Sequence, residues 1–148
     1  MRVDVFEHRF VEFVPRDIEP AVLYISIDYA TVVHLCASGC GNRVVTPLSP
    51  AGWQLLFDGE TVSLTPSIGN WGLPCHSHYF IRRNGVVWAA TWSRQRVLAA
   101  HAADERARAN WAADRRSGSA SAAQPDEGDS VQGNSELTHR DSGLPQRR

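Results

Sequence analysis

Hydrophobic and polar residues alternate in short runs along roughly the first ninety residues, and turn-forming residues separate the runs. Most runs are rich in β-branched and aromatic residues, which favour strands over helices. Asp58-Gly59 and Asn84-Gly85 are two-residue hairpin signals between such runs. We expect strands at 21–28, 31–35, 43–46, 53–57, 61–65, 78–82 and 86–89, preceded by one or two weaker strands within 3–14. The pattern predicts a mainly β fold, either a small antiparallel β-sandwich or an open barrel.

The pattern changes after Ser93, where alanine, arginine, leucine and glutamate dominate a continuous stretch. These residues favour a helix, and Ser93 is a suitable N-cap. The apolar face of this helix is thin, and we expect it to pack through Val97, Leu98 and Trp111. Beyond the helix the chain has almost no core-forming residues, which predicts disorder. The predicted organisation is a β-domain over 1–93, a helix over 94–116 and a disordered tail over 117–148.

All three cysteines lie in two short segments, Cys36-Ala-Ser-Gly-Cys40 and Cys75-His-Ser-His78. Each segment can direct two ligands to one point, and the long gap between them lets one metal ion join two remote loops. Gly39 and Gly41 allow the sharp turn that such a knuckle needs. The spacing is typical of a tetrahedral Cys₃His site, so we predict Zn²⁺ bound by Cys36, Cys40, Cys75 and His78.

The fourth ligand and the role of the metal have alternatives. His76 and His34 each lie close in sequence to a cysteine and compete with His78 as ligand. If His34 is not a ligand, we expect it to be a half-buried strand residue or to hydrogen-bond to one of the metal ligands. Four protein ligands make a structural site, whereas three leave an open position for an activated water. The chain has no His-Glu-x-x-His motif to supply a general base, which favours structural zinc.

The segment Pro66-Ser-Ile-Gly-Asn-Trp71 is a second candidate for chemistry. Ser67 is a possible nucleophile if a nearby histidine serves as its base. The more common outcome is a turn, in which Ser67 and Asn70 satisfy backbone groups and Trp71 fills the core. The chain has no Gly-x-Ser-x-Gly elbow that would favour an enzyme.

Charge and composition limit the partners. The net charge of −1 argues against a strongly basic nucleic-acid binder. Arginines and acidic residues are interleaved in 94–116, as on an ordinary solvated helix face. No apolar run reaches membrane-spanning length, and the first residues lack the apolar stretch of a signal peptide. We therefore expect no membrane association and a cytoplasmic location, where a Cys/His cluster binds metal more often than it forms disulfides.

Four segments carry a resemblance to a known family: Cys36-Ala-Ser-Gly-Cys-Gly41, Pro47-Leu-Ser-Pro50, Val62-Ser-Leu-Thr-Pro-Ser-Ile-Gly-Asn-Trp71 and Cys75-His-Ser-His-Tyr-Phe-Ile81. Over about residues 20–90 the chain resembles an uncharacterised bacterial family, domain-of-unknown-function family 6527. Members often read Cys-x-Cys-Gly-Cys at the first knuckle, where this chain has Ser38 in place of the middle cysteine. The resemblance therefore suggests that Cys36 and Cys40 are the pair that binds.

Some members of that family are encoded beside E1-like, E2-like and JAB-type peptidase components of ubiquitin-like conjugation. The resemblance implies an accessory role in a bacterial ubiquitin-like protein-modification or defence system, with an E1-like, E2-like or ubiquitin-like protein as partner. Three roles fit: a zinc-stabilised adaptor, a module that binds the ubiquitin-like protein, and a peptidase that uses Ser67 with His78 or His34 as base. We favour the non-enzymatic adaptor. The alternatives are a serine peptidase or hydrolase acting on a ubiquitin-like precursor or conjugate, and a nucleic-acid-associated zinc protein. His78 cannot be both zinc ligand and base, so two of these predictions compete for one residue.

Overall fold

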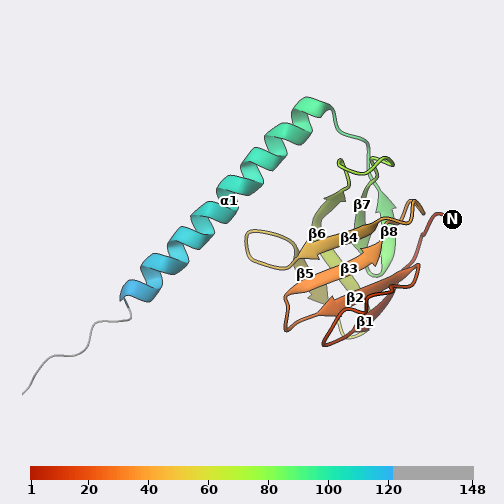
Figure 1. Cartoon of the computed structure of the whole chain (residues 1–148), viewed down its shortest axis with the longest axis horizontal. Coiled ribbons are helices and arrows are strands. Elements are labelled where there is room, and N and C mark those ends of the chain that lie inside the picture. The colour runs from red at the N-terminus through yellow and green to blue at the C-terminus, as the bar shows by residue number, and fades with distance from the viewer. Residues whose placement is uncertain (122–148) are drawn as a thin grey trace, which may run out of the picture.

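The computed structural model describes residues 1–121, with side chains up to residue 118, as two four-stranded sheets followed by one long helix (Figure 1). The first sheet contains, in spatial order, β1 (Glu7–Phe10), β2 (Val22–Ser26), β3 (Thr31–Leu35) and β4 (Arg43–Pro47). The second contains β5 (Gln54–Phe57), β6 (Val62–Gly69), β7 (His78–Arg82) and β8 (Gly85–Trp88). Helix α1 spans Arg94–Ser121. The predicted mainly β fold with a C-terminal helix is confirmed.

The first sheet is organised around β2, in which all five residues are buried. The antiparallel strand β3 lies on one side of it, and β1 pairs with it in parallel from Glu7↔Val22 to Phe10↔Ile25. This parallel pair is the one departure from the predicted antiparallel arrangement among the described strands. The chain returns from the end of β1 to the start of β2 through residues 11–21, which contain Pro15 and Pro20. Prolines favour such an irregular connection because they cannot donate to a strand ladder.

A corner joins the two sheets where the N-terminal segment meets the turn between β7 and β8. Phe6 N donates to Asn84 O and Val86 N donates to Asp4 O, each at 2.8 Å. The side-chain oxygen of Asn84 also accepts from Val62 N at 2.8 Å. The turn residues are Arg83 and Asn84, both with positive φ, one position earlier than the predicted Asn84-Gly85. These tertiary hydrogen bonds of Asn84 explain the shift, because they hold its backbone and side chain in the corner.

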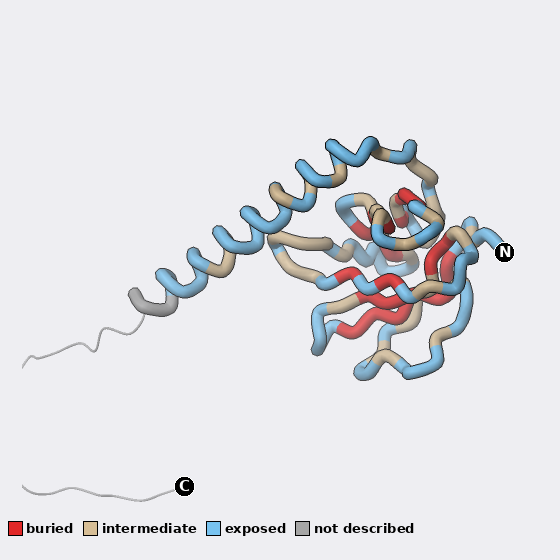
Figure 2. Tube along the Cα trace, turned by 45° about the horizontal axis from the view of Figure 1, so that its top comes forward, coloured by how far each residue is buried: buried red, intermediate tan, exposed pale blue. Residues whose placement is uncertain are grey.

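The hydrophobic core fills the space between the two sheets, where buried strand segments face each other (Figure 2). Both sheets contribute aliphatic side chains to it, and Phe6 and Tyr79 are its largest fully buried members. The fully buried aliphatic residues are Leu23, Ile25, Val32, Val62, Leu64 and Ile81. Burial of this apolar surface supplies the main driving force for folding of the β-domain.

Helix α1 begins as predicted, since Ser93 Oγ accepts a hydrogen bond from Arg96 N at 3.3 Å. Most of the helix is exposed (Figure 2). Val97 and Trp111 are half-buried as expected, but Leu98 is 60% exposed, so its predicted packing role is wrong. The helix continues to Ser121, past the predicted end at 116, and 122–148 of the predicted tail lie outside the described residues. In the part of the chain that is described, no helix has both the length and the apolarity needed to cross a membrane.

Candidate active site

Strand β6 carries Ser67 on a bulge opposite β7. Leu64 pairs with Ile81 and Ile68 pairs with Tyr79, so β6 has extra residues between these two pairs. Extra residues must leave the regular pleat, and a bulge re-aims the side chains beside it. Ser67 is half-buried at this point.

The sequence predicts that β6 ends at 65 and that a loop begins at Pro66. In the structure the strand instead continues to Gly69, and the Thr65–Pro66 peptide bond is cis. A proline is tolerated in a strand where the ladder is already interrupted, and the bulge is such a place. The serine predicted to lie in a loop is therefore part of a sheet.

His78 begins β7 and lies opposite Gly69 in the ladder. It is 5% exposed. Its Nε2 lies 2.9 Å from Ser67 Oγ, and its Nδ1 lies 2.7 Å from the Ala90 carbonyl oxygen. A carbonyl oxygen can only accept, so Nδ1 carries the ring hydrogen and Nε2 is left to accept from the Ser67 hydroxyl. This is the orientation in which a serine can transfer its proton to an imidazole.

Two tryptophans hold the imidazole of His78 in place. The ring of Trp92 lies edge-on to it at 5.0 Å between centroids, and Trp71 lies at 5.1 Å. The two indoles stack on each other at 5.7 Å. Gly69 makes room for Trp71, since a Cβ at this position would lie 2.6 Å from the indole Cε2. A larger residue at 69 would displace Trp71 and loosen the histidine.

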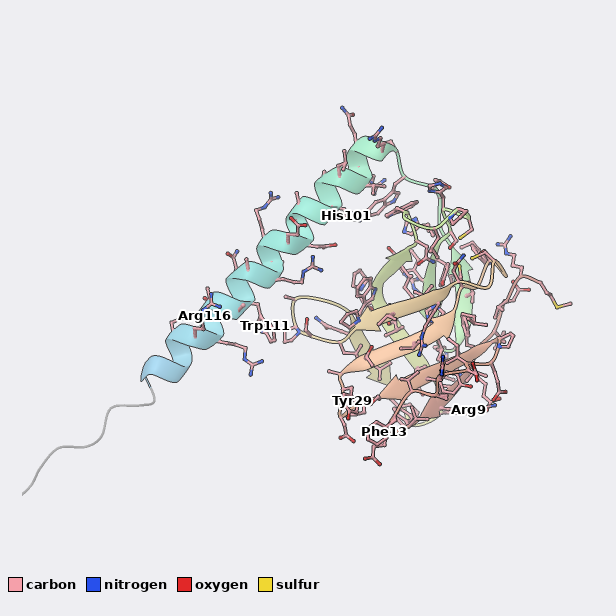
Figure 3. All side chains as sticks on the ribbon, viewed as in Figure 1. Arg9, Phe13, Tyr29, His101, Trp111 and Arg116 are labelled. Atoms are coloured by element: carbon pink, nitrogen blue, oxygen red, sulfur yellow. The ribbon has the colours of Figure 1, made fainter. Side chains whose placement is uncertain are left out.

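Ser67 and His78 line a cavity of about 210 Å³. β5 pairs with β6 only as far as Gln54↔Thr65, so the edge of β6 from Pro66 to Gly69 that faces away from β7 has no described strand beside it. The other lining residues come from β6 itself, from three tryptophans and from α1, namely Pro66, Gly69, Trp53, Trp71, Trp92, Ala100, His101 and Asp104. Figure 3 shows His101 on the side of α1 that faces the β-domain.

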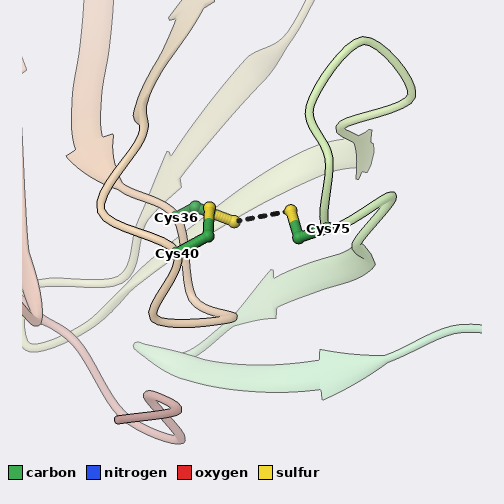
Figure 4. A group of neighbouring side chains, drawn as sticks. All are labelled: Cys36, Cys40 and Cys75. Atoms are coloured by element: carbon green, nitrogen blue, oxygen red, sulfur yellow. Dashed lines mark hydrogen bonds between the residues drawn. The ribbon is translucent and has the colours of Figure 1, made fainter.

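The three cysteines form a separate cluster (Figure 4). Their Sγ atoms all lie within 4.8 Å of one another, and Cys36 Sγ is 3.8 Å from Cys75 Sγ. A tetrahedral zinc ion with Zn–S bonds of about 2.3 Å holds its sulfurs about 3.8 Å apart. Gly39 and Gly41 adopt the positive φ predicted for the knuckle. Three cysteines at this spacing can hold a metal ion.

The surroundings of Cys40 and Cys75 favour the thiolate form of these two residues. The Ser38 hydroxyl, followed by the Asn42 side chain, lowers the pKa of Cys40 to about 6. Burial raises the pKa of Cys75, but hydrogen bonds from Ser38 and Ser77 bring it below its usual value. Thiolate is the form of cysteine that binds metal, so these groups match the chemistry of the cluster.

Asn70 connects the cysteine cluster to the segment between β6 and β7. Its side-chain nitrogen lies 2.8 Å from Ser77 Oγ, 3.4 Å from Tyr79 OH and 3.6 Å from Cys36 Sγ. Its backbone N also donates to Ser77 O at 2.8 Å. The connection that carries Cys75 is therefore tied to the strands that carry Ser67 and His78.

The other candidate histidines lie in neither site. His34 is buried in the core, where its Nε2 lies 2.9 Å from Tyr79 OH. Burial lowers the pKa of His34 to about 3, so it is neutral at physiological pH. His76 is exposed in the connection after Cys75. Among the described residues, the cysteine cluster contains no histidine.

The structure separates the predicted Cys₃His set. It brings the three cysteines together, but both ring nitrogens of His78 are engaged elsewhere, with Ser67 and Ala90. The reason is the alternation of side chains along a strand. Ser77 and Tyr79 direct their hydroxyls to the cysteine side, so His78 between them faces the opposite side. The structure thus contains the Ser67–His78 pair that competed with the zinc prediction.

Several residues around this pair were not predicted from the sequence. The Ala90 carbonyl has no sequence signature, because any residue can supply it. Trp92 is an aromatic residue directly before a helix, a signal that fits core packing equally well. His101 and Asp104 reach the cavity only because of the direction in which α1 leaves the β-domain.

Comparison with known families agrees with this geometry. A family model described as "Bacterial ubiquitination-like system serine protease (BubE)" matches residues 10–89. The matched segment contains Ser67, His78 and all three cysteines, and it ends before Trp92 and α1. No curated protein and no solved structure matches the chain. The link to bacterial ubiquitin-like systems implied by the sequence resemblance is thereby supported. Because the match spans more than half of the chain, the protein belongs to the BubE family of bacterial ubiquitination-like system serine proteases.

Proposed function

We propose that the protein is a serine hydrolase of a bacterial ubiquitination-like system, with Ser67 as nucleophile and His78 as general base. The observation that carries this proposal is the 2.9 Å contact between Ser67 Oγ and His78 Nε2, with Nδ1 of the same ring held by Ala90 O. The description of the family supports it. This function is the peptidase alternative from the sequence, and it takes precedence over the adaptor because it accounts for this contact.

The proposed reaction is acyl transfer through a covalent intermediate. Ser67 Oγ attacks the substrate carbonyl carbon while its proton moves to His78 Nε2. The bond to the leaving group breaks, and Nε2 gives that proton to the leaving nitrogen or oxygen. Water then attacks the acyl-Ser67 carbonyl, with Nε2 again taking and returning a proton. Throughout the cycle the Ala90 carbonyl accepts from Nδ1–H and orients the ring, the task that a carboxylate performs in a serine protease triad.

An extended peptide segment suits the approach to Ser67. The edge of β6 beside the serine has no strand partner in the described chain, and a peptide can add to such an edge through main-chain hydrogen bonds. The aromatic walls and the volume of about 210 Å³ favour a narrow segment over a folded surface. We infer that the substrate is a chain segment of a ubiquitin-like protein, in a precursor or in a conjugate.

We further propose that Cys36, Cys40 and Cys75 hold a structural Zn²⁺. The sulfur spacing and the lowered pKa values of Cys40 and Cys75 support this assignment. The ion would join the turn after β3 to the connection between β6 and β7, and so support the strands that carry the Ser67–His78 pair. A ligand other than His78 would take the fourth coordination position. An E1-like, E2-like or ubiquitin-like partner and a cytoplasmic location remain our expectations.

Cleavage of a ubiquitin-like precursor with a C-terminal extension tests the proposed function. The wild-type protein should remove the extension, and Ser67→Ala should abolish the reaction while retaining metal and the melting temperature. Ser63→Ala is the matched control, because Ser63 lies on the same strand but does not line the cavity. Cleavage by Ser67→Ala at the wild-type rate would overturn the proposal.

A further inference from the structure

Helix α1 forms one wall of the cavity that contains Ser67 and His78, although it lies outside the family match. Ala100, His101 and Asp104 line the cavity, and residues three or four apart share one face of a helix. The half-buried Val97 and Trp111 continue this face in both directions. The loop between β4 and β5 also reaches toward α1 (Figure 1). On this side, the wall of the cavity is therefore formed by α1 and not by the β-domain.

Asp104 brings a carboxylate to the wall of the cavity that α1 forms. It is the one acidic residue of the lining, and no arginine lines the cavity. The side chain of Asp104 has no hydrogen bond or ion pair with another described residue. Arg108, four residues later on the helix, is not paired with it. The carboxylate is therefore available to a substrate.

The other walls of the cavity also suit a cation. Trp53, Trp71 and Trp92 all line it, and an indole face attracts guanidinium and ammonium groups. Trp92 shows this attraction within the chain, where the Arg96 guanidinium lies 4.3 Å from the ring centroid. Because Trp92 is thus occupied by Arg96 and by the stacked Trp71, the indoles left to a substrate cation are those of Trp53 and Trp71. A carboxylate and indole rings that line the same cavity are a combination that recognises a cationic side chain.

We propose that α1 is the specificity wall of this site, and that Asp104 together with the indoles selects a substrate with an arginine or lysine side chain next to the bond that Ser67 attacks. This inference rests on the proposed hydrolase function, because it concerns the residue next to the bond that Ser67 would cleave. It concerns a segment beyond the family match, so it assigns a selectivity to this chain rather than to the family.

Matched peptide amides test the selectivity. They differ only in the residue beside the cleaved bond, which is arginine, its uncharged analogue citrulline, or glutamate. Wild type should cleave the arginine peptide with a kcat/KM about three- to tenfold above that of the citrulline peptide, the range for one partly solvated charge pair. Asp104→Asn should remove this difference, and Asp104→Arg should favour the glutamate peptide.

Glu105→Gln is the matched control for these kinetics. It removes the same charge one residue further along the helix, at a position that does not line the cavity, and should keep the wild-type preference. Melting temperatures of the variants check that α1 remains folded. An equal kcat/KM for the arginine and citrulline peptides in the wild type would overturn the inference.

A binding measurement separates this inference from the proposed function. The Ser67→Ala protein is titrated with N-acetyl-arginine amide and with N-acetyl-citrulline amide, and tryptophan fluorescence reports binding because three indoles line the cavity. The arginine compound should bind about three- to tenfold more tightly, and Asp104→Asn in the same background should abolish the difference. Equal affinity overturns the inference even if Ser67-dependent cleavage is established. A clear preference without any Ser67-dependent cleavage would support the inference and contradict the hydrolase.

Discussion

The Ser67–His78 pair and the cysteine cluster share one stretch of chain but are built in different ways. Strand pairing between β6 and β7 sets the positions of Ser67 and His78, so their hydrogen bond needs no added ligand. The cysteines come from turns and from a connection, and Cys40 is exposed. Strand pairing thus preorganises the Ser67–His78 pair, whereas the cysteine cluster brings together thiols that a metal ion would hold.

The two sites are close in sequence but face opposite sides of β7. Cys75 and His78 are separated by only His76 and Ser77, yet Cys75 lies with the other sulfurs and His78 lies with Ser67. Asn70 links the two regions through Ser77 and Cys36. A metal ion bound by the cysteines would therefore support the proposed Ser67–His78 pair through the connection between the strands, without contact with the reacting atoms.

The largest expected effect comes from removing the base. His78→Ala should lower the rate of acyl transfer on the order of 10³-fold, because Ser67 then has no group to accept its proton. Metal content should not change, since His78 lies with Ser67 and not with the sulfurs. Elemental analysis beside the cleavage assay measures both, with the exposed His76→Ala as control. Loss of metal with retained activity would restore His78 as a ligand and remove it as a base.

The next effect concerns the cluster. Cys75→Ala should lose bound zinc and lower the free energy of unfolding by about 3 kcal/mol or more, because metal binding energy contributes directly to folding. Denaturant unfolding with and without a chelator measures the change, and chelator should remove most of the difference between variant and wild type. A wild-type protein that is equally stable with and without chelator would argue against structural zinc.

A smaller effect tests how the indoles support His78. Gly69→Ala places a Cβ against Trp71 and should cost about 1–3 kcal/mol of stability through overpacking. Cleavage should also slow, since the displaced indole no longer holds the imidazole. Gly72→Ala is the control, because a Cβ there meets no atom within 4 Å. If Gly69→Ala and Gly72→Ala behave alike in both assays, the support of His78 by Trp71 is contradicted.

The smallest effect is a pH dependence of thiol reactivity. The Ser38 hydroxyl and Asn42 lower the pKa of Cys40 to about 6, so the thiolate is the main form above that pH. In metal-free protein, alkylation of Cys40 by iodoacetamide should rise as the pH passes through about 6 and then level off. Mass spectrometry of the modified peptide follows the reaction, and Ser38→Ala should move the midpoint upward. A midpoint near 9 in the wild type would contradict this environment.

The fold could be predicted from the sequence because most of its strands are short, punctuated runs with strong local signals. Val22–Ser26 and Thr31–Leu35 are β-branched or aromatic through most of their length, and their burial follows. No local sequence pattern predicted the parallel pairing of β1, because tertiary structure determines which strand a given strand pairs with. Helix α1 was predicted from composition, but the side of the domain it would face was not.

The sequence predicted which residue types form the candidate sites, but it did not predict which of these residues lie together. The knuckle spacing identified the three cysteines that come together. The same reasoning assigned His78 to the metal, because a Cys-x-x-His spacing is read as one loop. In the structure His78 is already part of β7, where alternation turns it away from the sulfurs. A bulge such as the one at Ser67 depends on pairing with a remote strand, so no local pattern reveals it.

Covalent labelling of the serine tests the central claim most directly. Wild-type protein is treated with a small fluorophosphonate, and the modified residue is located by mass spectrometry of its peptides. The account predicts one phosphonylated residue, Ser67, with labelling lost in His78→Ala. Labelling of another serine, or equal labelling of Ser67 with and without His78, would contradict it.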